Sequence, residues 1–101
     1  MINLTEQGDI LRIEGIKDLV LVLSKNYYNK SSKIVGCPIV KNARESILNV
    51  HIKTKDVEGV ALCDQLRNLD ISVRGYQIVS KIDISDKMLV SDIVQGIFDY
   101  I

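Results

Sequence analysis

The end of the chain, residues 85–101, carries an apolar stripe at the spacing of an amphipathic helix. Ser85, just before the stripe, is a residue type that caps helices. A stripe of this kind has to be buried, so the rest of the chain must provide a surface for it. We therefore predict a packed C-terminal helix whose stripe consists of Leu89, Val90, Ile93, Val94, Ile97 and Ile101.

Strand patterns supply that surface. Apolar and polar residues alternate at residues 8–16 and 47–55, and residues 33–40 are short and β-branched. Residues 70–84 return to this pattern, with a change of register at Gly75. Pro38 lacks a backbone donor, which favours a sheet edge for residues 33–40. We predict that residues 33–40 and 47–55 form a hairpin.

Two further segments are interpreted as helices. In residues 17–32, Asp18 can cap a helix, and the run continues to Asn29 without strand-forming residues. The letters LVLVL at residues 19–23 are equally typical of a buried strand, and periodicity leaves both possibilities open. In residues 56–69, Asp56 can cap a second helix, with Glu58 in its first turn.

The resulting order is strand, helix, strand, strand, helix, strand, helix. It predicts an α+β fold of the ferredoxin-like, split βαβ type, a two-layer sandwich with an added C-terminal helix. Residues 1–101 are the size of a single domain.

Composition excludes several functions. Thirteen basic and thirteen acidic side chains give a net charge of zero, so no long-range field attracts nucleic acid or anionic membranes. The chain begins without a signal peptide and has no run long enough to span a membrane, so we expect a cytoplasmic protein. Cys37 and Cys63 lack metal-ligand spacing, and we predict no metal or cofactor. His51 is where a proton-transfer role would fall, although a surface position is the simpler expectation.

Two short motifs resemble the toprim domain of primases and topoisomerases. They are RIEGIKD at residues 12–18 and KTKDVEG at residues 53–59. The resemblance implies Glu14 as the acid/base glutamate and Asp56 as the second acid of a magnesium-holding pair. The first acid would stand at position 54, where this chain has Thr54. Whether Glu14 and Asp56 form a site is left open.

The C-terminal helix is apolar on more than one face, and near-neutral charge favours self-association. We therefore predict a homo-oligomer or an unknown protein partner for this helix. A second surface combines aromatic rings with positive charge between Lys25 and Lys33. The predicted interaction residues are Tyr27, Tyr28, Lys25, Lys30, Lys33, Ile97, Phe98 and Ile101.

The leading functional interpretation is a small, non-enzymatic binding or regulatory module that acts through protein contacts, encoded by a phage or mobile element. No nucleophile motif, phosphate-binding loop or dinucleotide fingerprint is present in the sequence. The alternatives are nucleic-acid binding by the Lys25 to Lys33 cluster and a degenerate toprim-like, metal-dependent domain.

Overall fold

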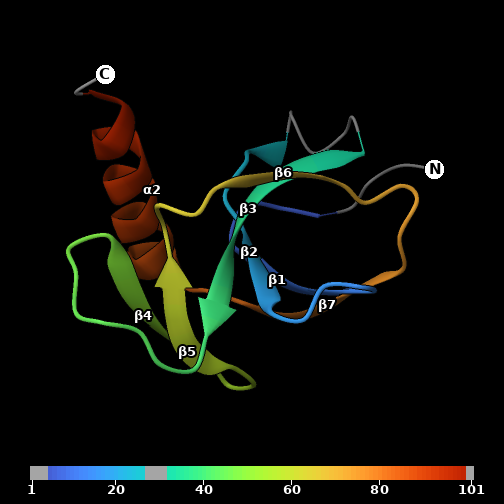
Figure 1. Ribbon diagram of the computed structural model, residues 1–101, viewed down its shortest axis with the longest axis horizontal. Coiled ribbons are helices and arrows are strands. Elements are labelled where there is room, and N and C mark those ends of the chain that lie inside the picture. Colours follow the sequence, from blue (N-terminus) through green and yellow to red (C-terminus); the bar gives the residue numbers. More distant parts are fainter. Residues whose placement is uncertain (1–4, 27–31, 100–101) are drawn as a thin grey trace.

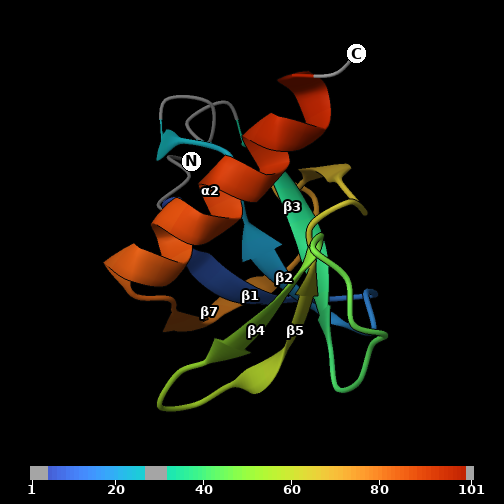
Figure 2. The same cartoon turned by 90° about the vertical axis from the view of Figure 1, so that its left-hand side faces the viewer.

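A curled antiparallel sheet with one long helix across its face forms the molecule (Figures 1 and 2). The computed structural model describes residues 5–26 and 32–99. The elements are β1 (Asp9–Ile13), β2 (Leu19–Val22), β3 (Lys33–Val40), β4 (Asn49–Lys53), β5 (Glu58–Leu62), β6 (Arg67–Asp70), β7 (Tyr76–Lys81) and α2 (Ile84–Asp99).

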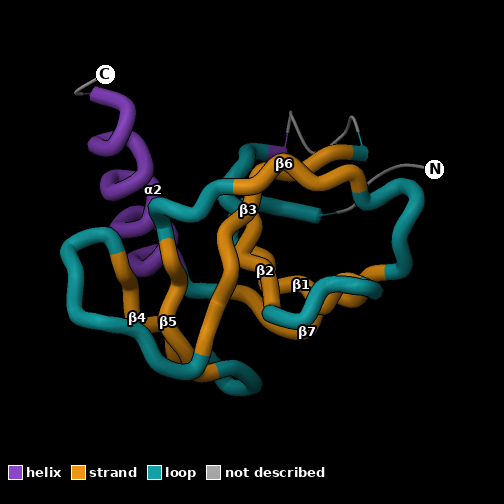
Figure 3. The backbone as a smooth tube through the Cα atoms, in the orientation of Figure 1, coloured by secondary structure: helices purple, strands orange, loops and turns teal. Residues whose placement is uncertain are grey.

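The strands follow the order β4-β5-β3-β2-β1-β7, and β6 pairs with β3 outside this path (Figure 3). Strand β3 therefore has three partners. One edge pairs with β2, while the other pairs first with β6, at Lys33 to Gly36, and then with β5, at Ile39 and Val40. We call the point where β3 changes partner the fork.

Strand β2 and Leu23, which follows it, join two hydrophobic cores. Leu19, Leu21 and Leu23 face the core beneath α2, to which Val90 also belongs. Val20 and Val22 face the second core, on the other side of the sheet, with Leu11, Ile13, Ile34, Leu69 and Ile71. Because successive side chains of a strand point to opposite faces, a strand buried on both faces needs an unbroken apolar run. LVLVL is such a run.

The predicted ferredoxin-like sandwich is wrong. Residues 19–22 form a strand in a β1–β2 hairpin, and the interval 56–69 contains β5 and most of β6. The predicted hairpin of residues 33–40 with 47–55 is also wrong, because β4 pairs with β5. Thr54 orders the β4–β5 turn by accepting hydrogen bonds from the backbone N–H groups of Asp56 and Val57, at 3.2 and 3.0 Å. Asp56 thus lies in a turn and caps no helix.

Pro38 lies inside the sheet, contrary to the predicted edge position. The backbone N–H of Leu23 donates to Val35 at 2.8 Å, so Val35 is a residue of β3 whose backbone faces β2. The backbone N–H and C=O groups of successive residues in a strand point toward opposite neighbouring strands. Cys37 and Ile39 then also face β2, whereas the nitrogen of Pro38 faces the fork between β6 and β5. No ladder hydrogen bond is lost there.

Helix α2 covers one face of the sheet (Figure 2). Val90 is buried, with Ile93 and Val94 packed against the same core. Asp83, and not the predicted Ser85, caps the helix: its Oδ1 accepts the Asp86 N–H at 2.8 Å and the Ser85 hydroxyl at 3.0 Å. Within residues 5–26 and 32–99, no helix is long and apolar enough to cross a membrane.

This cap predicts a pH-dependent stability. The hydrogen bonds from Asp86 and Ser85 lower the pKa of Asp83 below its ordinary value. A lowered pKa means that the stabilisation is complete at neutral pH and is lost as the pH falls through the folded-state value. Asp83→Ala should therefore lower the melting temperature at pH 7, and the difference from wild type should shrink below about pH 4. Circular dichroism melts across this range measure it.

Asp83→Asn is the matched control, because its amide oxygen can accept the same hydrogen bonds without titrating. It should melt above Asp83→Ala at pH 7. A difference between Asp83→Ala and wild type that stays constant down to pH 2 would contradict the cap.

Candidate functional site

A pocket of about 120 Å³ opens where β2, β3 and the start of β6 meet. We call it the β2–β6 pocket. Apolar groups make up part of its wall, and a carboxylate, an amide and a guanidinium make up its polar part. The lining residues are Ile16, Asp18, Val20, Gly36, Cys37, Pro38, Gln65, Arg67 and Leu69.

Two parts of the chain, distant in sequence, place the polar groups. Asp18 ends the β1–β2 turn, immediately before the first residue of β2. Gln65 lies in the β5–β6 turn, where its backbone N–H donates to the Leu62 carbonyl at 3.0 Å. Arg67 begins β6 directly opposite Gly36 of β3. The fork in β3 therefore brings the three groups around one opening.

These polar side chains, Asp18, Gln65 and Arg67, have no intramolecular hydrogen-bond or ion-pair partner among the described residues. Other charged groups have partners: Lys81 contacts Glu6 at 3.0 Å, and Asp70 accepts from the Ser72 hydroxyl at 2.6 Å. A guanidinium in a pocket is suited to binding phosphate oxygens, and a carboxylate can accept a hydroxyl proton.

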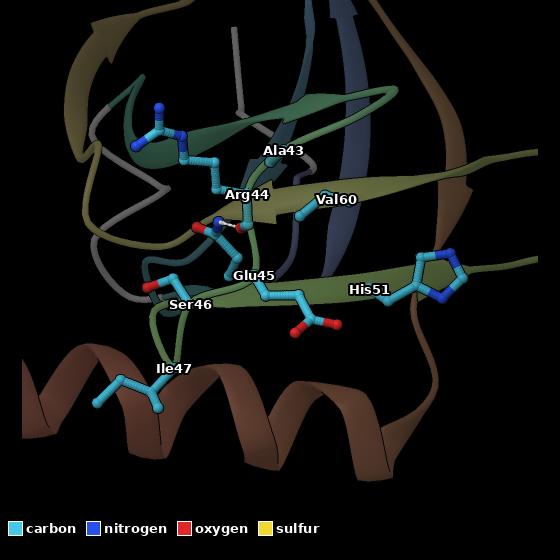
Figure 4. Close-up of a pocket in the computed structure, with 8 residues that line it drawn as sticks. Ala43, Arg44, Glu45, Ser46, Ile47, His51 and Val60 are labelled. Carbon is cyan, nitrogen blue, oxygen red and sulfur yellow. Dashed lines mark hydrogen bonds between the residues drawn. The ribbon is translucent and has the colours of Figure 1, made fainter.

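A wider hollow of about 540 Å³ lies over the outer face of β4 and β5 and is lined by His51, Arg44 and Glu45 among others (Figure 4). His51 Nε2 is 3.6 Å from Glu58 Oε2, and both side chains are more than half exposed. Figure 4 shows the Arg44 side chain directed away from His51. The polar groups of this hollow therefore do not converge as those of the β2–β6 pocket do.

The predicted interaction residues lie in different places. Lys25 and Lys33 are exposed, Ile97 is half-buried, and Phe98 is 56% exposed on α2. Tyr27, Tyr28, Lys30 and Ile101 lie outside the described residues. Lys25 lines a hollow together with Glu6, Gln7, Asn26 and Lys87. The proposed role of these residues in binding stays a prediction.

Glu14 and Asp56 lie in two separate turns. Glu14 follows β1 and its carboxylate lies against Gly75, whereas Asp56 is in the β4–β5 turn. In residues 5–26 and 32–99, no three His, Cys, Asp or Glu side chains gather as metal ligands.

Sequence reasoning missed the polar groups of the β2–β6 pocket. The sequence pattern predicts Asp18 as a helix cap and places Gln65 and Arg67 within a helix. The available signal was the cluster of polar residues in DQLRN, residues 64–68, between two apolar segments. That signal does not indicate which strand the cluster meets.

Because no side-chain hydrogen bond or ion pair among the described residues engages Asp18 or Arg67, we predict that their loss has little effect on folding. Asp18→Asn and Arg67→Gln should each change the free energy of unfolding by less than about 0.5 kcal/mol. The control is Asp9, a buried carboxylate whose Oδ2 accepts the Glu6 N–H at 2.9 Å and whose Oδ1 is 3.6 Å from Lys81 Nζ. Asp9→Ala should cost about 1–3 kcal/mol.

Urea unfolding of the three variants measures these differences. A loss of 2 kcal/mol or more in Asp18→Asn or Arg67→Gln would indicate that these side chains maintain the fold, not a binding site.

Comparison with known proteins identifies the fold. The structure of MazE–MazF (Form-I) from Deinococcus radiodurans shares 20% identity with this chain, over 98% of each chain, at a TM-score of 0.86. MazF (Form-I) from the same organism gives 20% identity, 98% coverage of each chain and a TM-score of 0.83. An endoribonuclease in complex with its cognate antitoxin from a mycobacterial species gives 16% identity over 91% of this chain and 92% of that one, at a TM-score of 0.79.

These structural matches cover nearly the whole molecule and establish the curled sheet with its C-terminal helix as a MazF-like fold. A search of curated proteins found no match. The family model for the PemK-like, MazF-like toxin of type II toxin-antitoxin systems matches residues 3–98.

The interpretation of the chain as a non-enzymatic binding module is therefore wrong: it is contradicted by the match to a toxin family and by the likeness to a solved endoribonuclease. The toprim-like alternative fails with it, because the fold is different. With 3–98 of its 101 residues matched, this chain belongs to the family of PemK-like, MazF-like toxins of type II toxin–antitoxin systems.

Proposed function

We propose that this chain is an endoribonuclease, the toxin of a toxin–antitoxin pair. The observation that carries the proposal is the family match over residues 3–98. A mycobacterial relative of the same fold is described as an endoribonuclease, which supports the same reading. We propose that this chain acts on RNA in the cytoplasm.

The β2–β6 pocket offers the groups that such a reaction needs. RNA can be cleaved by its own 2′-hydroxyl once a base removes the hydroxyl proton and a cation binds the phosphate. In our proposal Asp18 accepts that proton, and the Arg67 guanidinium binds the phosphate oxygens as negative charge develops on them. The 2′-oxygen bonds to phosphorus, and the 5′-oxygen leaves with a proton from water.

The apolar lining has a role beside these charges. Ile16, Val20, Pro38 and Leu69 surround the polar groups. Apolar walls can take the face of an unpaired base, and the Gln65 amide can bond to its edge. The proposed substrate is therefore single-stranded RNA with one base held beside the cleaved phosphate.

The proposal predicts RNA cleavage that depends on the β2–β6 pocket. Purified protein should cleave a single-stranded RNA and leave 5′-hydroxyl ends. Arg67→Gln should lower kcat/KM on the order of 100-fold, because a donor to the phosphate is lost. Asp18→Asn should lower it on the order of 100-fold through loss of the base. Gel analysis of end-labelled RNA measures both.

His51→Gln is the matched comparison from the outer face of β4. It should cleave RNA within about twofold of wild type, since its exposed pair with Glu58 lies outside the pocket. Loss of cleavage in His51→Gln with full activity in Arg67→Gln would move the site to the wider hollow. A wild-type protein that cleaves no RNA would refute the function itself.

We also infer that the chain pairs with a second copy and with an antitoxin. The solved relatives include complexes of MazF with MazE and of an endoribonuclease with its cognate antitoxin. Helix α2 exposes large apolar side chains that are suited to a protein contact: Ile84 at 72%, Met88 at 63% and Leu89 at 49% exposure.

Analytical ultracentrifugation tests this inference. The wild type should sediment as a dimer and form a larger complex with an antitoxin. Met88→Glu should shift it toward monomer, because a charge is buried in the apolar contact. Gln95→Glu, at an exposed polar position of α2, should leave the dimer intact. A wild type that is monomeric at micromolar concentration would contradict the dimer.

A further inference from the structure

Two cysteines meet across the core at the fork. Cys37 lies on β3 and Cys63 follows β5, and they are 1% and 0% exposed. Strands β3 and β5 pair with Ile39 opposite Ala61 and Val40 opposite Val60. Continuing this antiparallel register by two residues places Cys37 opposite Cys63. Both side chains belong to the core beneath α2.

The two thiols interact within this core. Their mutual hydrogen bonding raises the pKa of Cys37 and lowers the pKa of Cys63. The Cys63 thiol also donates to the Ala61 carbonyl at 3.8 Å. Directly opposite residues of antiparallel strands have Cα atoms about 4.5–5.5 Å apart. This separation falls within the range of about 4.4–6.8 Å that disulfides span.

The pair also adjoins the β2–β6 pocket. Cys37 is one of the residues that line the pocket, and its side chain extends to the other face of the sheet, into the core beneath α2. Cys63 begins the β5–β6 turn that carries Gln65, two residues further along the chain. One cysteine thus borders the pocket, and the other anchors a loop that lines it.

We propose that Cys37 and Cys63 are a site of oxidative modification and form a reversible disulfide when the protein meets a peroxide. The thiolate of one cysteine attacks a peroxide oxygen, and the O–O bond breaks to give a sulfenic acid and one water. The second thiol then attacks the sulfenic sulfur and expels a second water. The two thiols lose two electrons and two protons, and the peroxide gains both.

The disulfide would alter the pocket. A disulfide brings its two sulfurs to about 2 Å, closer than hydrogen-bonded thiols approach. The β5–β6 turn starts at Cys63, so a backbone adjustment that completes the bond also displaces Gln65 in that turn. A displacement near 1 Å of a group that positions the substrate lowers activity on the order of 100-fold.

Mass spectrometry tests the bond itself. The folded wild type is treated with hydrogen peroxide, quenched, denatured and alkylated with N-ethylmaleimide. We expect a protein that has lost two hydrogens and takes up no alkyl group, and that takes up two after dithiothreitol. A wild type that still takes up two alkyl groups, or that gains oxygen in place of losing hydrogen, would overturn the proposal.

Cys63→Ala is the control, because it keeps the pocket-lining cysteine and should show no loss of two hydrogens. The disulfide should also raise the melting temperature of wild type by about 10 °C, with no such rise in Cys63→Ala. These readouts need no RNA and so do not depend on the proposed function.

The effect on the pocket rests on the proposed function. Peroxide should lower RNA cleavage by wild type on the order of 100-fold, dithiothreitol should restore it, and Cys63→Ala should keep its activity in peroxide. If the disulfide forms while cleavage is unchanged, the modification site stands and its control of the pocket is wrong. If the reduced protein cleaves no RNA, the proposed function fails and the disulfide result is unaffected.

Discussion

The pairing of β3 with three strands is the constraint on which the rest of the structure depends. The edge of β3 that faces away from β2 pairs first with β6 and then with β5. The sheet therefore has to curl at the point where the partner changes. On both sides of that point the backbones of neighbouring strands have to approach each other closely. A Cβ at Gly36 would lie 2.9 Å from the Leu21 carbonyl oxygen, and one at Gly59 would lie 2.8 Å from the Val40 carbonyl oxygen. Backbone atoms cannot give way as side-chain ends can, so glycine is required at both positions.

The same strand also brings the site together. The β2–β6 pocket draws Asp18 from one turn, Gln65 from another and Arg67 from the start of β6. Asp18 is far from Gln65 and Arg67 along the chain, and β3, which pairs with both β2 and β6, brings them together. Ion pairs and hydrogen bonds elsewhere stabilise turns and caps, as Asp83 does for α2. The pocket keeps its polar groups free for a ligand, which makes it the better candidate over the wider, open hollow around His51.

Much of the local structure could be predicted from the sequence. The C-terminal helix and the strands at β1, β3, β4 and β7 follow their patterns, because each exposes or buries one face in a regular way. LVLVL could not be assigned, because its alternate side chains enter two different cores and every position is apolar. The segment after Asp56 has a helix-like start, yet Thr54 satisfies the backbone there and turns the chain into β5. Partner choice was the larger failure, since no residue in β3 indicates that it pairs with β5 and β6 in place of β4.

Burial of β2 on both faces has a consequence for how the molecule responds to change. Val20 belongs to the core on the pocket side and also lines the pocket, while Leu21, the next residue, packs into the core beneath α2. A strand buried on two sides makes the two cores a single cooperative unit, because neither can loosen without displacing the other's side chains. A structural change at the surface of α2 and a change in the pocket are therefore mechanically coupled through β2. They are coupled even though the two places lie apart.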